Sequence, residues 1–456
     1  MSKRLACGTL FDALSASAQK DGIVVIEDGM IRYAGPAASA PPPRPGDEML
    51  DYSRFFVMPG LIDVHTHLSY GNAKTEEDID LYGALEFRAI RGVFFAQQVL
   101  AAGYTSLCVP GDAGHVSTSI RDAIDAGLFP GPRVTTAGPY LTNRQGLTDW
   151  YPTWIGVPET ANSRVVRSSV EAIEEIRRQV KDGVDCIKIA MDGRDIRPNG
   201  ELVAAFTQEE TDVMVREAHR LGRKVVVHAR GREAVLYSAK ASADLIFHAS
   251  WMDKEGLEWV VKNGCAISPT LTYMRHSIDF TQDIDPSGKR GRRESATHEF
   301  EIACKALRLA REAGVPMMTG TDSGFAITPY GEWHAREIGI FVRYLGFSPA
   351  QALQCATATS AQFLRDGDRL GALQPGRHAD LVVVDGDPLQ DVSLLLKRER
   401  LHAIYLAGEK VELKRRSYNP RKVSDFAYTW WNDLYTQQRV EELGLGGDFA
   451  QAGKHS

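Results

Sequence analysis

The sequence predicts an α/β protein, with a (β/α)8 TIM barrel and a small β-sandwich built from both ends of the chain. Three observations predict this architecture. Apolar, β-rich runs alternate with helical stretches over about three hundred residues, the pattern of parallel βα units. The 456 residues exceed the roughly 250 that a barrel needs, and so leave room for an accessory module. Short strands separated by Asp-Gly and Gly-Glu turns flank the alternating region on both sides.

Eight runs read as the barrel strands. They span residues 57–67, 105–110, 133–138, 186–191, 224–228, 245–248, 265–271 and 315–321. Amphipathic stretches lie between them, such as 169–182 and 207–221, and the second opens with Thr-Gln-Glu-Glu, which resembles a capping box. Eight strands with intervening helices predict a closed barrel.

The flanks at 22–35 and 379–413 read as antiparallel strands. Each alone is too small to bury a core, so one sandwich assembled from both is the economical interpretation. We therefore expect four parts: 1–56 and 369–416 as the two parts of the sandwich, 57–368 as the barrel, and 417–456 as an aromatic C-terminal extension with a mobile end.

Composition excludes several classes of protein. Apolar residues make up 43% and charged residues 25%, the net charge is -6, and no block of basic residues could follow a nucleic-acid backbone. No run approaches the ~18 apolar residues of a membrane span, and the start does not read as a signal peptide, so we expect a cytoplasmic protein. The six cysteines stand far apart without a Cys-x-x-Cys pair, which indicates reduced core residues. We expect a small-molecule substrate and a homo-oligomer, with the aromatic segment 426–435 as a candidate arm between subunits.

Six polar residues stand at or just after the carboxyl ends of predicted barrel strands. They are His65, His67, Lys188, His228, His248 and Asp322. In a barrel these strand ends form the active-site face, so residues far apart in sequence converge there. His65 and His67 are two residues apart on a strand, so both imidazoles project to one side and can bind one metal ion. Only twelve histidines occur in the chain, and four of them fall on these ends.

Lys188 requires a separate explanation, because an ammonium group is not an ordinary metal ligand. One interpretation is a lysine in the barrel interior that pairs with a carboxylate. The other is a neutral amine that has reacted with carbon dioxide, giving N6-carboxylysine whose two oxygens bridge two metals. Nearby cations disfavour the ammonium and lower its pKa, which favours the modification.

The motifs VMPGLIDVHTH at 57–67 and GTDSG at 320–324, with Lys188, His228 and His248, resemble the amidohydrolase superfamily. The segment GALQPGRHADLVVVDGDPL at 371–389 is similar to the strand by which that superfamily returns to its β-sandwich. The resemblance implies two divalent metal ions, with His65, His67 and Asp322 on one, His228 and His248 on the other, and carboxylated Lys188 bridging. It also makes Asp322 the general acid/base. Zinc is the default metal, and manganese, cobalt or iron suit the same ligands.

Within the superfamily, HARGREAVLYSAKASADLIFHAS at 228–250, SPTLTYM and GTDSGFAITPYGEWHARE resemble the prolidase-like branch. That branch includes enzymes that hydrolyse phenylureas, thiocarbamates such as molinate, and aromatic amides such as ochratoxin. The resemblance thus implies hydrolysis of an amide, urea or carbamate C–N bond in a small, largely apolar aromatic substrate. A prolidase-like dipeptidase is the main alternative, and it needs a cation for the free carboxylate: Arg230, Arg232 or Arg275. A noncatalytic metal-binding barrel is the alternative from another class.

Substrate contacts are expected from the loops after the strands. The stretch 140–157 concentrates aromatic side chains beside the predicted mouth, where they either anchor the loop or line the pocket. The candidate substrate-binding residues are Tyr140, Trp154, Arg230, Tyr273 and His334.

Overall fold

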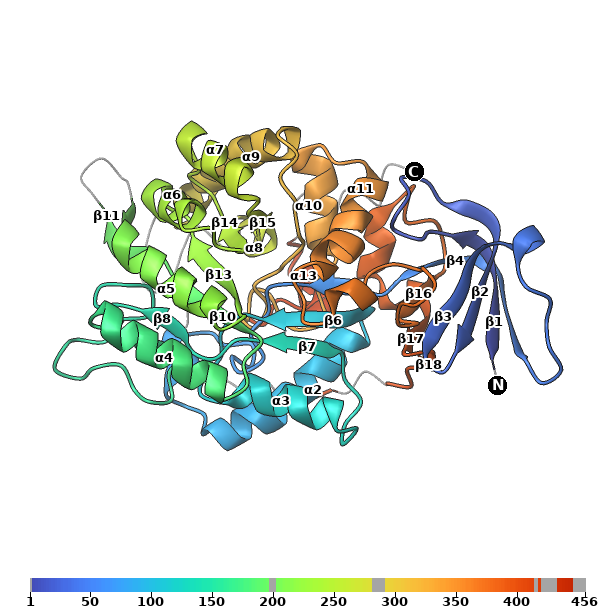
Figure 1. The fold of residues 1–456 in the computed structure, drawn as a ribbon, viewed down its shortest axis with the longest axis horizontal. Coiled ribbons are helices and arrows are strands. Elements are labelled where there is room, and N and C mark those ends of the chain that lie inside the picture. Colours follow the sequence, from blue (N-terminus) through green and yellow to red (C-terminus); the bar gives the residue numbers. More distant parts are fainter. Residues whose placement is uncertain (1, 197–201, 281–291, 414–416, 420–432, 446–456) are drawn as a thin grey trace.

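A computed structural model describes residues 2–196, 202–280, 292–413, 417–419 and 433–445 (Figure 1). Strands of both chain ends lie together on one side of the molecule, and the alternating strands and helices form the rest. The predicted mobile end, residues 446–456, lies outside the described residues. So does most of the candidate intersubunit arm.

One seven-stranded sheet combines both chain ends. Its order is β18-β17-β16-β4-β1-β2-β3, and β1 and β4 are its only parallel neighbours. The bounds are β1 Lys3–Leu10, β2 Gln19–Glu27, β3 Met30–Pro36, β4 Glu48–Pro59, β16 Leu381–Val384, β17 Leu401–Leu406 and β18 Glu409–Lys410. Asp28 and Gly29, both at positive φ, form the predicted Asp-Gly turn between β2 and β3. The two-layer sandwich stays a prediction, because these strands form one sheet.

The middle of the chain forms parallel sheets. A three-stranded sheet holds β5 Leu61–Asp63, β6 Tyr104–Val109 and β7 Arg133–Thr136. A six-stranded sheet, in the order β15-β14-β13-β10-β8-β9, holds β8 Tyr140–Thr142, β9 Ser163–Val165, β10 Cys186–Ala190, β13 Lys224–Ala229, β14 Leu245–His248 and β15 Ala266–Ser268. A small hairpin pairs β11 Asp192–Ile196 with β12 Leu202–Ala204. Parallel α/β structure is therefore confirmed, and seven of the eight predicted strand regions contain a strand.

The predicted eighth strand, 315–321, contains no assigned strand and forms only an isolated bridge, between Met317 and Ile267. Backbone hydrogen bonds nevertheless link the two sheets and segment 315–321. Asp185 N–H donates to Thr136 O at 2.8 Å, Met318 N–H to Ile267 O at 2.8 Å, and Val64 N–H to Thr319 O at 3.0 Å. The described strands thus form two parallel sheets with linked edges, and a continuous closed barrel is not assigned.

Helices connect the strands and cover the parallel sheets (Figure 1). They are α1 Glu76–Asp80, α2 Leu85–Leu100, α3 Val116–Asp125, α4 Ser169–Lys181, α5 Gln208–Arg220, α6 Arg232–Lys240, α7 Lys254–Asn263, α8 Leu271–Asp279, α9 Arg292–Glu312, α10 Arg336–Leu345, α11 Pro349–Gln354 and α13 Gln437–Glu442. Short turns of helix are η1 Ala37–Ser39, η2 Cys355–Thr359, η3 Gly367–Arg369, η4 Val392–Leu396 and η5 Arg398–Arg400. The predicted capping box is present at α5, where Thr207 and Glu210 exchange side chain–backbone hydrogen bonds.

Buried apolar side chains fill the space between the parallel strands and the helices. All six cysteines are buried and free, as predicted. Among the described residues, no helix has the length and apolar character that crossing a membrane requires.

Candidate metal centre

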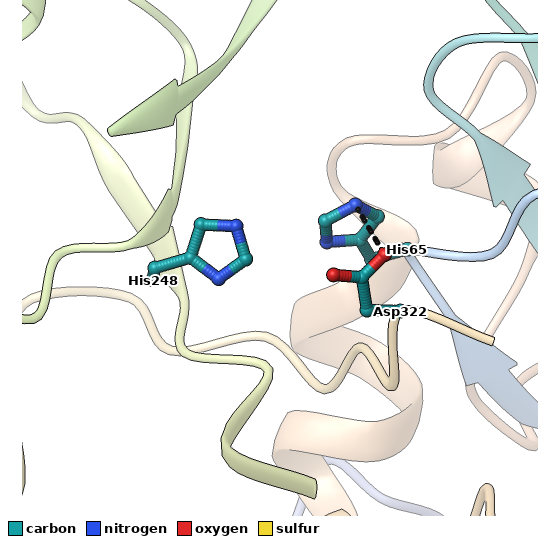
Figure 2. Close-up of side chains that lie close together, drawn as sticks. All are labelled: His65, His248 and Asp322. Carbon is teal, nitrogen blue, oxygen red and sulfur yellow. Dashed lines mark ion pairs between the residues drawn. The ribbon is translucent and has the colours of Figure 1, made fainter. Parts of the chain in front are cut away.

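Three of the predicted metal ligands face one another closely. The nearest donor atoms of His65, His248 and Asp322 all lie within 4.8 Å of one another, and Figure 2 shows the three side chains converging from separate segments. Asp322 Oδ1 lies 3.4 Å from His65 Nε2 and 3.2 Å from His67 Nε2. His67 thus borders the same cluster, next to its sequence neighbour on the segment that follows β5.

His228 and Lys188 complete the predicted set from the neighbouring strands β13 and β10. His228 Nδ1 lies 2.9 Å from His248 Nε2. Lys188 Nζ lies 3.9 Å from the centroid of the Phe247 ring and faces the same pocket as the histidines. Among the described residues no carboxylate forms an ion pair with Lys188. Burial lowers the pKa of the Lys188 amine to about 7, although the charge of the nearby Asp322 acts to raise it, so a neutral amine is accessible.

The outward-facing nitrogens of three imidazoles meet other groups. His67 Nδ1 lies 2.6 Å from Gly111 O, His248 Nδ1 lies 2.5 Å from Thr270 Oγ1, and His228 Nε2 lies 3.1 Å from Asp192 Oδ2. Such contacts fix the ring orientation and leave the inner nitrogen of each ring free to bind a metal. Burial, the largest cause, lowers the pKa of His65, His228 and His248, which keeps these imidazoles neutral. Neutral imidazoles facing a carboxylate fit a divalent cation.

Asp192 was not among the predicted site residues. It follows β10 and is 3% exposed. Its carboxylate accepts hydrogen bonds from the backbone N–H of Gly231 at 2.9 Å and of Arg230 at 2.5 Å, and it contacts His228. Burial acts to raise its pKa, but His228 and the two N–H groups lower the pKa overall. Asp192 therefore remains a carboxylate and connects the strand of Lys188 to the strand of His228.

Four residues of the site have positive φ although none is glycine. They are His248 (φ 70°), Ala249 (φ 50°), Thr270 (φ 52°) and Asp322 (φ 56°). This left-handed conformation costs an L-residue roughly 1–2 kcal/mol. At Asp322 the conformation is held by a hydrogen bond from its own N–H to His65 O at 2.8 Å and by one from Thr328 Oγ1 to Asp322 O at 3.0 Å. The pKa of Asp322 is lowered, because the neighbouring His67, His248 and Lys188 outweigh the effect of burial.

The cluster lies in a pocket of about 530 Å³. Five aromatic side chains line it: Tyr70, Tyr140, Trp150, Tyr273 and Phe325. Its polar lining includes Arg230, Glu299, Ser277 and Ser295. The volume is in the range of small-molecule sites, and the lining combines apolar area with a few polar groups.

Three of the five candidate substrate-binding residues line this pocket: Tyr140, Arg230 and Tyr273. Trp154 does not, because it lies in the turn after Pro152 and is 84% exposed; Trp150 lines the pocket in its place. His334 is buried outside the pocket lining, where its Nδ1 lies 2.6 Å from Asp63 Oδ2. Asp63 also accepts a hydrogen bond from the backbone N–H of His65 at 2.9 Å, so His334 supports the His65 segment from behind.

Each arginine considered for a dipeptidase has a carboxylate partner. Arg230 pairs with Glu299, with Nε 2.7 Å from Oε1. Arg232 lies 3.6 Å from Asp253, and Arg275 lies 2.6 Å from Asp279. Of the three, only Arg230 lines the pocket.

Comparison with known proteins places this geometry in a family. The model of the amidohydrolase family matches residues 56–411. The chain is 26% identical to the ochratoxinase of Aspergillus niger over 418 residues, covering 86% of this chain and 82% of the ochratoxinase. The crystal structure of a Xaa-Pro dipeptidase with bound methionine is 28% identical, with a TM-score of 0.77, and the match covers 90% of this chain and 100% of the dipeptidase.

The fold is also similar to that of phenylurea hydrolase B, with a TM-score of 0.72, 21% identity, and coverage of 90% of this chain and 97% of that one. The predicted resemblance to the superfamily and its branch is thus confirmed. Because the family model spans both the parallel sheets and the strands that return to the terminal sheet, the chain belongs to the amidohydrolase family.

Proposed function

We propose that the protein is a binuclear metal-dependent hydrolase that cleaves the C–N bond of a small, largely apolar aromatic amide, urea or carbamate, such as a phenylurea. One observation carries the proposal: the imidazole and carboxylate cluster opens into a pocket lined by five aromatic side chains. A flat aromatic group would bury its area against these rings while its C–N bond faces the cluster.

In the proposed centre, His65, His67 and Asp322 would hold one divalent ion, and His228 and His248 would hold the other. Lys188, as N6-carboxylysine, would be shared between them. The inward-facing nitrogens and the absence of an ion-paired carboxylate at Lys188 among the described residues support this assignment. Zinc is proposed as the default metal, and manganese, cobalt or iron suit the same imidazole and carboxylate ligands.

We further propose that the two linked parallel sheets and segment 315–321 form one (β/α)8 barrel, with the domain limits predicted from the sequence. β4 continues to Pro59, so the limit at residue 56 falls within a strand. The hydrogen bonds between the sheet edges support the barrel. A cytoplasmic location and a homo-oligomer stay predictions.

Asp322 is the proposed general acid/base. Metal ions bound here would lower the pKa of water and polarise the substrate carbonyl. Asp322 Oδ1 faces His65 and His67, and Figure 2 shows the second oxygen pointing toward His248. That second oxygen is placed to accept the proton of the attacking water and to deliver it to the leaving nitrogen. The lowered pKa of Asp322 keeps it ionised for the first of these steps.

A dipeptidase is the second candidate, favoured by the 28% identity to a Xaa-Pro dipeptidase and by Arg230 in the pocket. The pairing of Arg230 with Glu299 counts against it, since a substrate carboxylate would compete with Glu299 for the guanidinium. A noncatalytic metal-binding barrel is the third candidate.

A substrate panel tests these candidates. Metal-loaded protein is assayed with N-phenylurea, a thiocarbamate, an N-acyl aromatic amide and several Xaa-Pro dipeptides, with Asp322→Asn as the inactive control. Turnover of an aromatic amide, urea or carbamate above the dipeptides is the expected result. Preference for the dipeptides would replace the proposal with the dipeptidase. Two bound metal equivalents without turnover on any substrate would favour the binding protein.

A further inference from the structure

The described part of the C-terminal extension, 433–445, packs against its own chain. Tyr435 and Val440 are each 4% exposed and belong to the main apolar core. Gln437 Nε2 donates to Glu332 O at 2.6 Å and to Leu396 O at 2.8 Å. The segment is therefore held by specific contacts on both sides of Thr436, which caps α13.

Tyr435 connects two segments of the pocket wall. Its backbone N–H donates to Ala326 O at 3.1 Å, directly after the pocket residue Phe325. Its ring stacks on Phe280, with centroids 5.3 Å apart and an interplanar angle of 13°, just after the end of α8. Trp333 Nε1 donates to Tyr435 O at 2.6 Å and so fixes the Tyr435 backbone from a third direction.

The two segments that Tyr435 contacts from outside meet again inside the pocket. The Phe325 ring centroid lies 5.2 Å from that of Tyr70 and 5.2 Å from that of Tyr273, which is carried by α8. Ala326 N–H donates to Ala73 O at 2.8 Å. Ala326 is therefore bonded to Ala73 on one side and to Tyr435 on the other. It lies four residues after Asp322 in the same segment.

We propose that segment 433–445 is a positioning element of the active site: through Tyr435 it sets Phe325 and Tyr273 relative to the metal cluster and thereby the preference for aromatic substrates. The inference rests on the proposed function for its choice of substrates. In the interactions described, Tyr435 contacts none of the six proposed ligands. Its loss should therefore change how an aromatic group binds, while the metal content stays the same.

The test uses Trp333→Phe in the full chain, because phenylalanine retains an aromatic ring but removes the N–H that bonds Tyr435 O. The matched control is Trp259→Phe, on the outer helix α7, where Lys262 lies over the indole ring. KM and kcat are measured with N-phenylurea and N-methylurea. Losing one buried hydrogen bond should lower the preference for N-phenylurea about tenfold, through KM, with kcat and metal content unchanged.

Hydrogen exchange supplies a readout independent of turnover. In Trp333→Phe, amides of 271–280 and 322–328 should exchange faster, whereas those of β10 and β13 should not. An unchanged substrate preference, or an equal loss for both ureas, would overturn the positioning role. If the wild type turns over neither urea, the proposed function fails on these substrates, and hydrogen exchange alone tests the positioning role. Faster exchange confined to 271–280 and 322–328 would support that role. Unchanged exchange, or faster exchange throughout the protein, would overturn it.

Discussion

Replacing Asp192 by asparagine should weaken metal binding at the His228 side of the centre. The carboxylate faces three nitrogen groups: the N–H of Gly231 on Oδ1, and the N–H of Arg230 and His228 Nε2 on Oδ2. An asparagine amide has one oxygen, so either orientation turns its NH2 group against at least one of these donors. Where the NH2 faces His228, it also favours the tautomer with the proton on Nδ1, the proposed ligand atom.

The structure sets the expected size of the effect. A hydrogen bond to a charged group contributes about 1.5–3 kcal/mol, and each 1.4 kcal/mol is about a tenfold change in affinity. Because Asp192 is 3% exposed, water cannot readily replace the lost acceptor. We expect metal affinity to fall about 10- to 100-fold, as for other groups that orient metal-binding histidines.

The assay is a titration of metal-free protein with zinc in a competing chelator, with bound metal counted by atomic emission. The matched control is Asp244→Asn, because Asp244 also contacts a histidine, His219 at 2.8 Å, and a backbone N–H, that of Val225 at 2.7 Å. These contacts lie at the opposite end of β13. Equal metal affinities in the two variants would refute the reasoning, because Asp192 would then contribute no more to the site than a structural aspartate does.

Two of the three further predictions concern the proposed ligands, and the third concerns Glu337, a buried carboxyl group that accepts hydrogen bonds from the backbone N–H of Leu271 and Thr272. Asp322→Asn should keep most of the metal but lower kcat by about 100-fold or more, and retained turnover in a metal-loaded sample would contradict its role. Lys188→Arg cannot carry a carboxylate on its amine, so it should bind fewer than two metal equivalents. In native mass spectrometry it should also lack the added mass of carbon dioxide that we expect for the wild type. Burial raises the pKa of Glu337 from its ordinary value of 4.5 to about 7. The folded state thus binds more protons between these values, and stability should fall as pH rises through this range; Glu337→Gln should flatten this part of the profile in thermal unfolding.

The parallel strands could be predicted because their sequences are continuous apolar runs, such as the buried VVV of β13. Such runs are typical of strands that are covered on both faces of the sheet. The eighth predicted strand, 315–321, is not assigned as a strand in the structure. Gly320 approaches His65 so closely that a Cβ there would lie 2.8 Å from His65 Cβ, and the backbone enters the left-handed region at Asp322. The segment pairs only in the isolated bridge between Met317 and Ile267. β1 was not predicted, because its short apolar run has no turn signal before it.

The proposed ligands could be predicted because histidines at strand ends are few and their placement is a property of the sequence. Their supporting partners could not be, because a carbonyl such as Gly111 O is present at every residue. Asp192 carried one weak signal: it is a carboxylate just beyond the strand of Lys188. Trp154 was predicted to bind substrate, but Trp150 lines the pocket instead. The direction of a side chain in a loop depends on contacts that the spacing of residues does not encode, so the sequence could not distinguish the two tryptophans.

The four left-handed residues at the strand ends, His248, Ala249, Thr270 and Asp322, place stability and activity in opposition. Glycine adopts this conformation without the steric cost, so at Ala249 a glycine should be accepted or even favoured in a selection for stability alone. At His248 and Asp322 a glycine selected for stability would remove a proposed metal ligand and, at Asp322, the proposed general acid/base. Under selection for thermal stability without a demand for turnover, the chain is therefore expected to lose its function first at the positions on which that function most depends.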